Sequence, residues 1–239
     1  MKSDMTFTDI LTNGLISYSG STTSYVLGAI AVAALSYLIG SVNFAVIFSR
    51  SKGEDVRLYG SGNAGATNVM RRYGKWGAAL VFTCDFLKSV LCVFIGMLLM
   101  PADGFGYVAA LFCMLGHTFP LYFGFKGGKG VAVCAGAMVV LNPLAAAISF
   151  VVYALFLLFS RYVSLSSLAM VGVFPILNYY FPFSLFSLPE GDVDVRSLVN
   201  YILRMTLPIL WAIFVCIAHV ENIKRLIKGT ESKAGEKNQ

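Results

Sequence analysis

Long apolar runs separated by short polar segments fill most of this chain. Seven such runs lie at approximately residues 25–48, 77–100, 107–125, 131–141, 143–160, 165–183 and 199–218. The hydrocarbon core of a bilayer needs roughly 20 helical residues, and a helix satisfies its own backbone polar groups there. The pattern therefore predicts an all-α, polytopic membrane protein with seven transmembrane helices.

The fourth run, residues 131–141, is too short to cross a bilayer by itself. It ends at Asn142-Pro143, so we expect it either to tilt into that break or to begin inside the preceding loop. Both ends of the chain are polar. We therefore divide the chain into an N-terminal extension (1–24), a membrane domain (25–231) and a C-terminal tail (232–239).

The composition also indicates an integral membrane protein. Of 239 residues, 57% are hydrophobic and only 13% are charged, a balance that a water-soluble domain does not show. The five cysteines all lie in apolar runs and form no CxxC pair, so neither disulfides nor a metal site is expected. The net charge of +6 lies in the loops, which argues for membrane topology and against nucleic-acid binding.

Basic residues are distributed unevenly between the two sides of the predicted bundle. One side collects Arg50, Lys52, Arg57, Arg71, Arg72, Lys75, Lys126, Lys129, Arg161 and the five Lys and Arg residues of 224–237. The other side has Lys2, Arg196 and Arg204 beside six acidic residues. The positive-inside rule then predicts an inner-membrane protein with its N-terminus outside and its C-terminus in the cytoplasm.

A glycine-containing loop on the basic side, residues 59–72, has the composition of a phosphate site. Glycines can turn backbone N–H groups toward an anion, Ser61 and Asn63 add hydrogen-bond donors, and a following helix adds its dipole. An ordinary Gly/Asn turn that caps a helix would look similar.

Two further segments on the same side suit anions. In Phe125-Lys-Gly-Gly-Lys129-Gly130, little side-chain bulk separates a phosphate from the backbone at a predicted helix start. The spacing of a P-loop is absent, so a nucleotide is not expected, and a flexible basic turn is the plainer alternative. His219 and Asn222 stand three apart and share a helical face, although a solvated histidine is common at such a place.

Charged residues also occur inside the second run. Asp85 and Lys88 are three apart, and an ion pair is the simplest way to reduce the cost of burying both. Whether that pair is structural or catalytic stays open. Ser166 and Ser167 lie at the cytoplasmic end of the sixth run and could bring hydroxyl groups to the loops, whereas Gly40 more simply permits close helix packing.

These side chains favour a reaction of phosphorylated substrates that needs no metal, cofactor or covalent nucleophile. An acyl phosphate is already activated, so the protein must orient a hydroxyl group, help remove its proton and stabilise an oxyanion. Candidate catalytic residues are Ser61, Arg71, Lys129, His219 and Asn222. Candidate substrate-binding residues are Gly60, Gly62, Asn63, Asn68, Gly127, Gly128, Gly130, Ser166 and Ser167.

From Tyr25 to Glu231 the sequence resembles the acyl-phosphate:glycerol-3-phosphate acyltransferase (PlsY) family. The resemblance rests on three motifs: residues 60–71, residues 127–130, and His219-x-Glu-Asn222 with Lys228-Gly-Thr-Glu231. It implies seven spans, lysophosphatidic acid as product, and a functional hand-off with enzymes that make acyl phosphate or use the product. It also implies phosphate-binding roles for Ser61, Arg71, Lys129, Ser167, His219 and Asn222, and a part for the substrate's own phosphate in deprotonation. Ala64 stands where the family often has proline.

Two other classes of protein fit less well. A transporter of anions also has buried charges and broken helices, but we find no internal repeat, and the polar groups gather at one surface instead of the midplane. A purely structural membrane protein leaves the glycine-rich loops unexplained.

Overall fold

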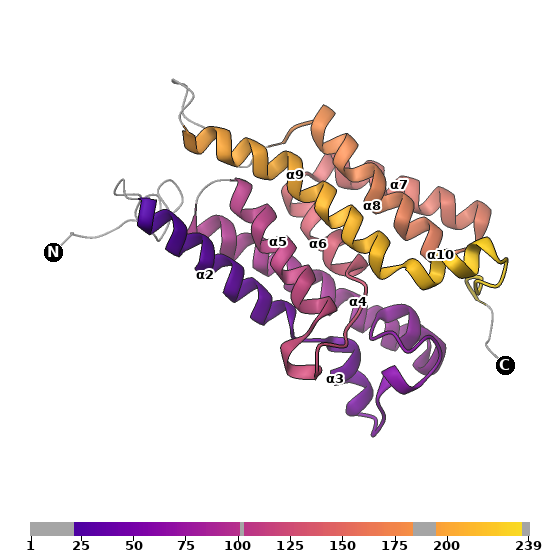
Figure 1. Cartoon of the computed structure of the whole chain (residues 1–239). Coiled ribbons are helices and arrows are strands. Elements are labelled where there is room, and N and C mark those ends of the chain that lie inside the picture. Colours follow the sequence, from indigo (N-terminus) through magenta and orange to yellow (C-terminus); the bar gives the residue numbers. More distant parts are fainter. Residues whose placement is uncertain (1–21, 101–102, 184–194, 236–239) are drawn as a thin grey trace.

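The computed structural model of the chain describes residues 22–100, 103–183 and 195–235, and these are helical without any strand. Most of the predicted N-terminal extension and the acidic stretch at 184–194 lie outside the described residues. In order, the elements are α2 (Thr22–Gly40), α3 (Phe44–Arg50), η1 (Val56–Leu58), α4 (Ala66–Leu99), α5 (Asp103–Thr118), η2 (Leu121–Phe123), α6 (Val131–Leu141), α7 (Pro143–Ser160), α8 (Val163–Tyr180), α9 (Val195–Ala218) and α10 (Val220–Ile227) (Figure 1).

The prediction of an all-α membrane bundle is confirmed. Within the described ranges, six helices are long and apolar enough to cross a bilayer: Thr23–Arg50, Ala66–Leu99, Gly104–Phe123, Pro143–Ser160, Val163–Tyr180 and Leu198–Ala218. The short run at 131–141 forms α6 with the expected bounds. Eleven helical residues reach only about 16 Å at 1.5 Å per residue, roughly half of the hydrocarbon core.

The first predicted span, residues 25–48, falls within the apolar helical segment Thr23–Arg50, which is broken between Gly40 and Phe44. The side chain of Asn43 caps α3 by accepting a hydrogen bond from the backbone N–H of Val46 at 3.1 Å. The carbonyl of Val42 accepts from Lys88 Nζ at 2.7 Å. Polar side chains of the protein thus satisfy backbone groups that the break leaves open.

Two predicted boundaries are wrong. α4 begins at Ala66 instead of residue 77 and continues through a kink at Gly74, whose φ is 82°. α5 ends at Thr118 instead of residue 125, because Pro120 cannot continue the helix. The polar segment before residue 77, which we expected to be a loop, therefore forms the start of α4. The apolar segment after Thr118, which we expected to be helical, forms part of a loop.

The loop before α6, residues 124–130, lies against the end of α5. The N–H groups of Gly127 and Gly128 donate to the carbonyls of Thr118 and His117, both at 3.1 Å. The carbonyl of Gly127 accepts from the N–H of Ala64 at 3.4 Å. Irregular backbone beside apolar helices is tolerated where protein groups satisfy it, as they do for this loop.

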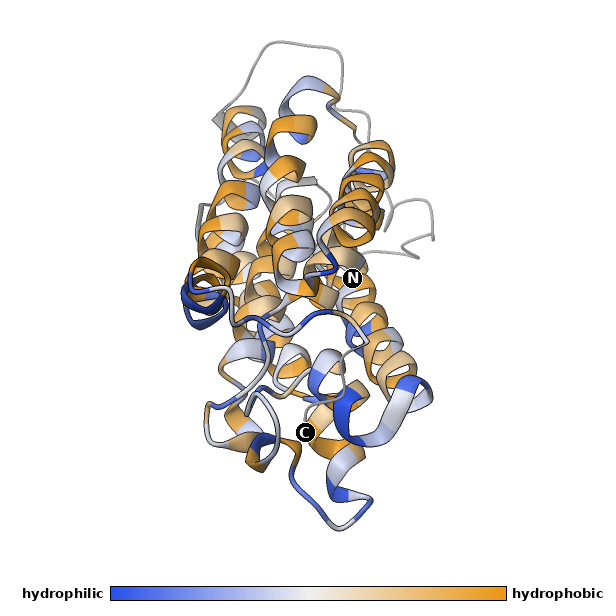
Figure 2. Ribbon diagram, turned by 90° about the vertical axis from the view of Figure 1, so that its right-hand side faces the viewer, coloured by the Kyte–Doolittle hydropathy of each residue, from blue (hydrophilic) through white to orange (hydrophobic). Residues whose placement is uncertain are grey.

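Aromatic stacking and close backbone approach hold the bundle together. Trp211 of α9 stacks on Tyr107 and Phe174, with ring centroids 5.6 and 6.3 Å apart, and all three rings are buried. Gly40 permits the predicted close packing, since a Cβ there would lie 2.3 Å from the carbonyl oxygen of Cys113. Figure 2 shows hydrophobic ribbon along the bundle and hydrophilic ribbon gathered toward the end that carries the connecting loops.

Candidate active site

A cavity of about 620 Å³ lies where the polar loops meet the ends of α4, α8 and α9. It brings together most of the candidate residues from all three motifs. Those that line it are Ser61, Asn63, Asn68, Arg71, Lys129, Gly130, Ser167, His219 and Asn222. Segments separated by about 150 residues in the sequence therefore contribute to one site.

Asn68, at the start of α4, shapes the first loop. Its amide donates to the carbonyls of Val56 and Tyr59, both at 2.9 Å, and its oxygen accepts from the N–H of Ser61 at 3.2 Å. Gly60 has a φ of 56° and leaves room for this side chain, because a Cβ there would lie 2.4 Å from the Asn68 oxygen. The backbone N–H of Ser61 is thus engaged within the loop. The loop therefore presents side chains to the cavity in place of this N–H group.

The glycines of the second loop divide into two groups. Gly130, at the N-terminus of α6, lines the cavity with Lys129. Gly127 and Gly128 do not line it; they permit contact with α5, since added Cβ atoms would lie 2.0 Å from the His117 carbonyl oxygen and 2.1 Å from His117 Nε2. Gly60 and Gly62 likewise lie outside the lining.

A chain of hydrogen bonds joins the second motif to the third. Lys129 Nζ donates to the side-chain oxygen of Asn222, whose amide donates to Glu231 at 2.6 Å. Glu231 also accepts from Arg225 Nε at 2.7 Å. Because Glu231 holds its amide, Asn222 presents its oxygen to Lys129, and the chain segment after α10 closes over this side of the cavity with Ser232 and Lys233.

The electrostatics at this end favour an anion. Burial first, and then the nearby positive charges of Arg225 and Arg71, lower the pKa of Lys129 to about 8 against the attraction of Glu231. Burial and the charge of Lys129 lower the pKa of His219 to about 4. At pH 7 Lys129 is charged and His219 neutral, so a bound phosphate would relieve the repulsion among the cations.

His219 has one nitrogen available to a ligand. Its Nδ1 lies 2.8 Å from the carbonyl oxygen of Val215, one turn earlier, which makes Nδ1 the donor in the neutral ring. Nε2 is then an acceptor on a side chain that lines the cavity. α9 ends at Ala218 and α10 begins at Val220, so the bend between them sets the direction of this ring.

The two adjacent candidate serines have different surroundings. Ser167 lines the cavity, and its hydroxyl donates to the Val163 carbonyl at 2.8 Å. Ser166 is fully buried and lies outside the lining. Ser164, three residues before Ser167, takes the place that we had given to Ser166, as the period of a helix requires once α8 begins at Val163 instead of residue 165.

Sequence reasoning left several lining residues out of the candidate site, among them three buried titratable ones. Asp85 and His117 lie at its membrane side, and Asp85 forms the expected ion pair with Lys88 at 2.7 Å. Glu231 was noted only as part of a motif. The charge of Asp85 within an apolar run was a usable signal, since polar residues within membrane spans commonly mark functional sites.

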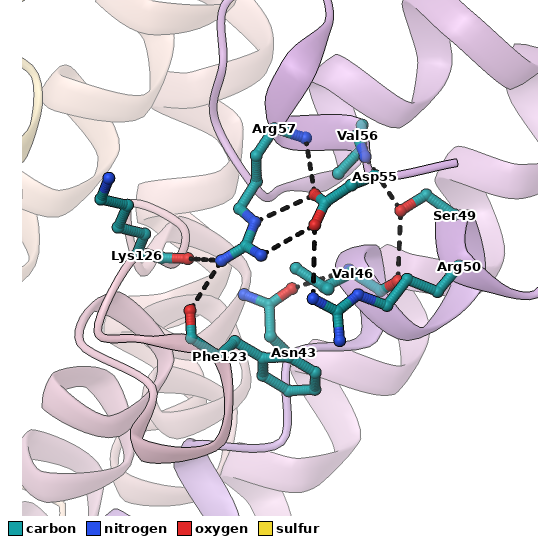
Figure 3. Close-up of polar contacts among 9 residues, drawn as sticks. All are labelled: Asn43, Val46, Ser49, Arg50, Asp55, Val56, Arg57, Phe123 and Lys126. Atoms are coloured by element: carbon teal, nitrogen blue, oxygen red, sulfur yellow. Dashed lines mark hydrogen bonds and ion pairs between the residues drawn. The ribbon is translucent and has the colours of Figure 1, made fainter. Parts of the chain in front are cut away.

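Arg57 joins the first loop to the second without lining the cavity. Its guanidinium forms a bidentate pair with Asp55 at 2.9 and 2.7 Å, and it donates to the carbonyls of Phe123 at 2.7 Å and Lys126 at 3.1 Å (Figure 3). Arg50 also contacts Asp55, at 3.5 Å, from a more exposed position. Arg57 thus fixes the register between the two loops.

Apolar side chains also line the cavity. Met70, Phe82, Tyr153 and Val163 line it together with the cations Arg71 and Lys129. A cavity lined by both cations and aromatic and aliphatic side chains suits a molecule that combines a phosphate with a hydrocarbon chain.

Comparisons with known proteins agree with this chemistry. The family model described as glycerol-3-phosphate acyltransferase matches residues 30–229. A glycerol-3-phosphate acyltransferase from Thermoanaerobacter sp. is 39% identical over 212 residues, covering 88% of this chain and 98% of its own length. One from Halalkalibacterium halodurans is 40% identical over 212 residues, covering 85% and 94%.

A solved structure is also similar. The crystal structure of PlsY (YgiH), an integral membrane glycerol 3-phosphate acyltransferase, in its glycerol 3-phosphate form, has a TM-score of 0.75 and 34% identity. The match covers 87% of this chain and 96% of that one. The lysophosphatidic acid form of the same protein has a TM-score of 0.73.

Proposed function

The chain belongs to the glycerol-3-phosphate acyltransferase family, and from this premise we propose that it transfers the acyl group of an acyl phosphate to the sn-1 hydroxyl of glycerol 3-phosphate. The products are lysophosphatidic acid and inorganic phosphate, as in the first acylation of phospholipid synthesis. The observation that carries the proposal is the cavity in which Ser61, Lys129 and His219 meet, which both cations and apolar side chains line.

The reaction needs no group beyond the two substrates and the side chains of the site. The sn-1 oxygen attacks the carbonyl carbon of the acyl phosphate and forms the ester bond. The bond from that carbon to the bridging phosphate oxygen then breaks, and its electron pair leaves with inorganic phosphate. Arg71 and Lys129 stabilise the phosphate charges, while Ser61, Ser167 and Asn222 orient the substrates by hydrogen bonds.

The hydroxyl proton passes to the phosphate of glycerol 3-phosphate. The second pKa of a phosphate monoester is about 6, whereas the pKa of His219 is about 4. The phosphate is therefore the stronger base of the two at neutral pH. His219 accepts a hydrogen bond from a substrate hydroxyl group through Nε2 and does not change its charge.

We propose that the protein crosses the inner membrane seven times, with α6 as the short fourth crossing, and that the cavity opens to the cytoplasm. The basic loops support this orientation by the positive-inside rule. It can be tested by placing a cysteine at Lys228 in a variant without the five natural cysteines. A membrane-impermeant maleimide should label it in inverted vesicles and leave it unlabelled in intact cells; the reverse pattern would contradict the orientation.

Purified protein in lipid tests the reaction itself. With acyl phosphate and glycerol 3-phosphate it should release inorganic phosphate and lysophosphatidic acid in equal amounts. Acyl-CoA, supplied in place of acyl phosphate, should give no product, because its thiol leaving group lacks the charge that Arg71 and Lys129 bind. Equal or better rates with acyl-CoA would contradict the proposed donor, and no product with either donor would contradict acyl transfer.

A further inference from the structure

Lys88 of α4 has a buried ammonium group with three polar partners. Its Nζ lies 2.7 Å from the carbonyl oxygen of Val42, 2.7 Å from Asp85 Oδ1 and 3.1 Å from His117 Nδ1. An ammonium group has three N–H donors and no acceptor. Lys88 forms hydrogen bonds with Val42 and His117 and an ion pair with Asp85, whose Oδ1 accepts no hydrogen bond from the described residues. Because the ammonium group can only donate, His117 Nδ1 is the acceptor in its hydrogen bond with Lys88.

This arrangement fixes the proton of His117. A neutral imidazole has one donor and one acceptor nitrogen, so a ring that accepts at Nδ1 carries its proton on Nε2. Lys88, Asp85 and His117 are each at least 95% buried, so this arrangement is shielded from bulk water. The result is a neutral ring with an N–H group directed away from Lys88.

The Nε2 side of His117 packs against the second motif, and His117 also lines the cavity. His117 lines the cavity together with Asp85, Lys129 and Gly130. Its Nε2 lies so close to Gly128 that a Cβ on that residue would be 2.1 Å away. Gly128 thus packs against the Nε2 side of the ring with its backbone alone, and it has no side chain to block the Nε2–H group.

We propose that His117 is a further catalytic residue, whose Nε2–H group donates a hydrogen bond to the carbonyl oxygen of the acyl phosphate. This inference rests on the proposed function. As the sn-1 oxygen attacks, that carbonyl oxygen gains negative charge, and a fixed neutral donor in a site shielded from water stabilises it. Lys88 and Asp85 act through His117 as positioning residues.

The place of His117 in the cavity selects the carbonyl oxygen over the phosphate. The cations Arg71, Lys129 and Arg225 are at the loop end, where Arg71 and Arg225 are close enough to lower the pKa of Lys129. His117 instead lies on the last turn of α5, in contact with Asp85 of α4. Asp85 comes eleven residues after the kink at Gly74, which is about 16 Å along the helix at 1.5 Å per residue. An acyl chain in the membrane and a phosphate at the loops leave the carbonyl group between them, at the depth of His117.

The test compares His117→Ala, His117→Gln and Thr118→Val, each reconstituted in lipid with acyl phosphate and glycerol 3-phosphate. Removing one oxyanion donor lowers kcat by about 100-fold to 1,000-fold. We expect that loss for His117→Ala, with KM for glycerol 3-phosphate unchanged within about threefold. The amide of His117→Gln can supply a donor near the position of Nε2, so kcat should recover to within about tenfold of the unchanged protein.

Thr118→Val keeps the backbone bond to Gly127 and should retain full turnover and thermal stability, because Thr118 does not line the cavity. A kcat unaffected by His117→Ala would overturn the inference. A kcat of His117→Gln as low as that of His117→Ala would also overturn it, since His117 would then have only a structural role. In both cases the unchanged protein is active, which leaves acyl transfer intact; no product from the unchanged protein would overturn acyl transfer and this inference together.

Discussion

The ammonium group of Lys129 donates a hydrogen bond to the side-chain oxygen of Asn222, 93 residues later in the chain. Each residue alone is ambiguous, because a lysine between glycines or an asparagine near a helix start has several ordinary explanations. Their contact joins the loop before α6 to α10 and places a partly buried cation beside His219. The predictions below depend on this joined site.

Replacing Lys129 should abolish most activity without unfolding the protein. Lys129→Met removes the cation that faces the phosphates, and we expect kcat/KM to fall by about 100-fold or more. Arg72→Met is the matched control, because Arg72 pairs with Glu54 at 2.5 Å and does not line the cavity. Steady-state kinetics should leave this control within about threefold of the unchanged protein. Equal losses in both variants would remove Lys129 from the site.

Activity should decline at alkaline pH. The pKa of Lys129 is lowered to about 8, so its charge is present at pH 7 and is lost as the pH rises through 8. The pH profile of kcat/KM for glycerol 3-phosphate, which reports the free enzyme, should therefore fall above pH 8. An arginine keeps its charge there. In Lys129→Arg the alkaline fall should disappear, and a fall that persists would assign it to another group.

The acidic side of the same profile should follow the substrate. We assign the hydroxyl proton to the phosphate of glycerol 3-phosphate, because the pKa of His219 is lowered to about 4. A phosphonate analogue, whose second pKa is higher, should shift the acidic limb of kcat/KM to higher pH. A limb that stays in place with the analogue but disappears in His219→Gln would instead identify His219 as the base.

Arg57 should affect catalysis from outside the cavity. Arg57→Gln removes the hydrogen bonds to Phe123 and Lys126, so the first and second loops lose their fixed register. We expect kcat/KM to fall by about tenfold, since small displacements of substrate-positioning groups are costly. Arg50→Gln is the matched control, because Arg50 shares the partner Asp55 and is more exposed. Kinetics in which both variants lose activity equally would trace the effect to Asp55.

Gly128 should tolerate no side chain. In Gly128→Ala the new Cβ would lie 2.1 Å from His117 Nε2 and 2.8 Å from the carbonyl oxygen of Ala64, so backbone must move. We expect a lower thermal midpoint and a loss of turnover of at least about tenfold. Gly172→Ala in α8 meets no atom within 4 Å and should leave the midpoint unchanged or higher. A stable, fully active Gly128→Ala would contradict the packing described for this loop.

The sequence by itself determined the properties that depend on neighbouring residues in the chain. Apolar length predicted the all-α bundle and the short helix at 131–141, and the cost of unpaired intramembrane charge predicted the contact between Asp85 and Lys88. The three polar motifs could also be recognised, because their residue types suit phosphate whatever the fold. Those candidate residues that line the cavity were found in this way.

Only the tertiary structure decided what each backbone segment contacts. The break after Gly40 depends on a hydrogen bond from Lys88 to Val42, and the kink in α4 depends on the left-handed conformation at Gly74. Gly128 faces a histidine of another helix, whereas Gly130 faces the cavity. Hydrophobicity and charge are carried by each residue wherever it lies, but the choice between a ligand and a neighbouring helix is made by contacts between residues far apart in the chain.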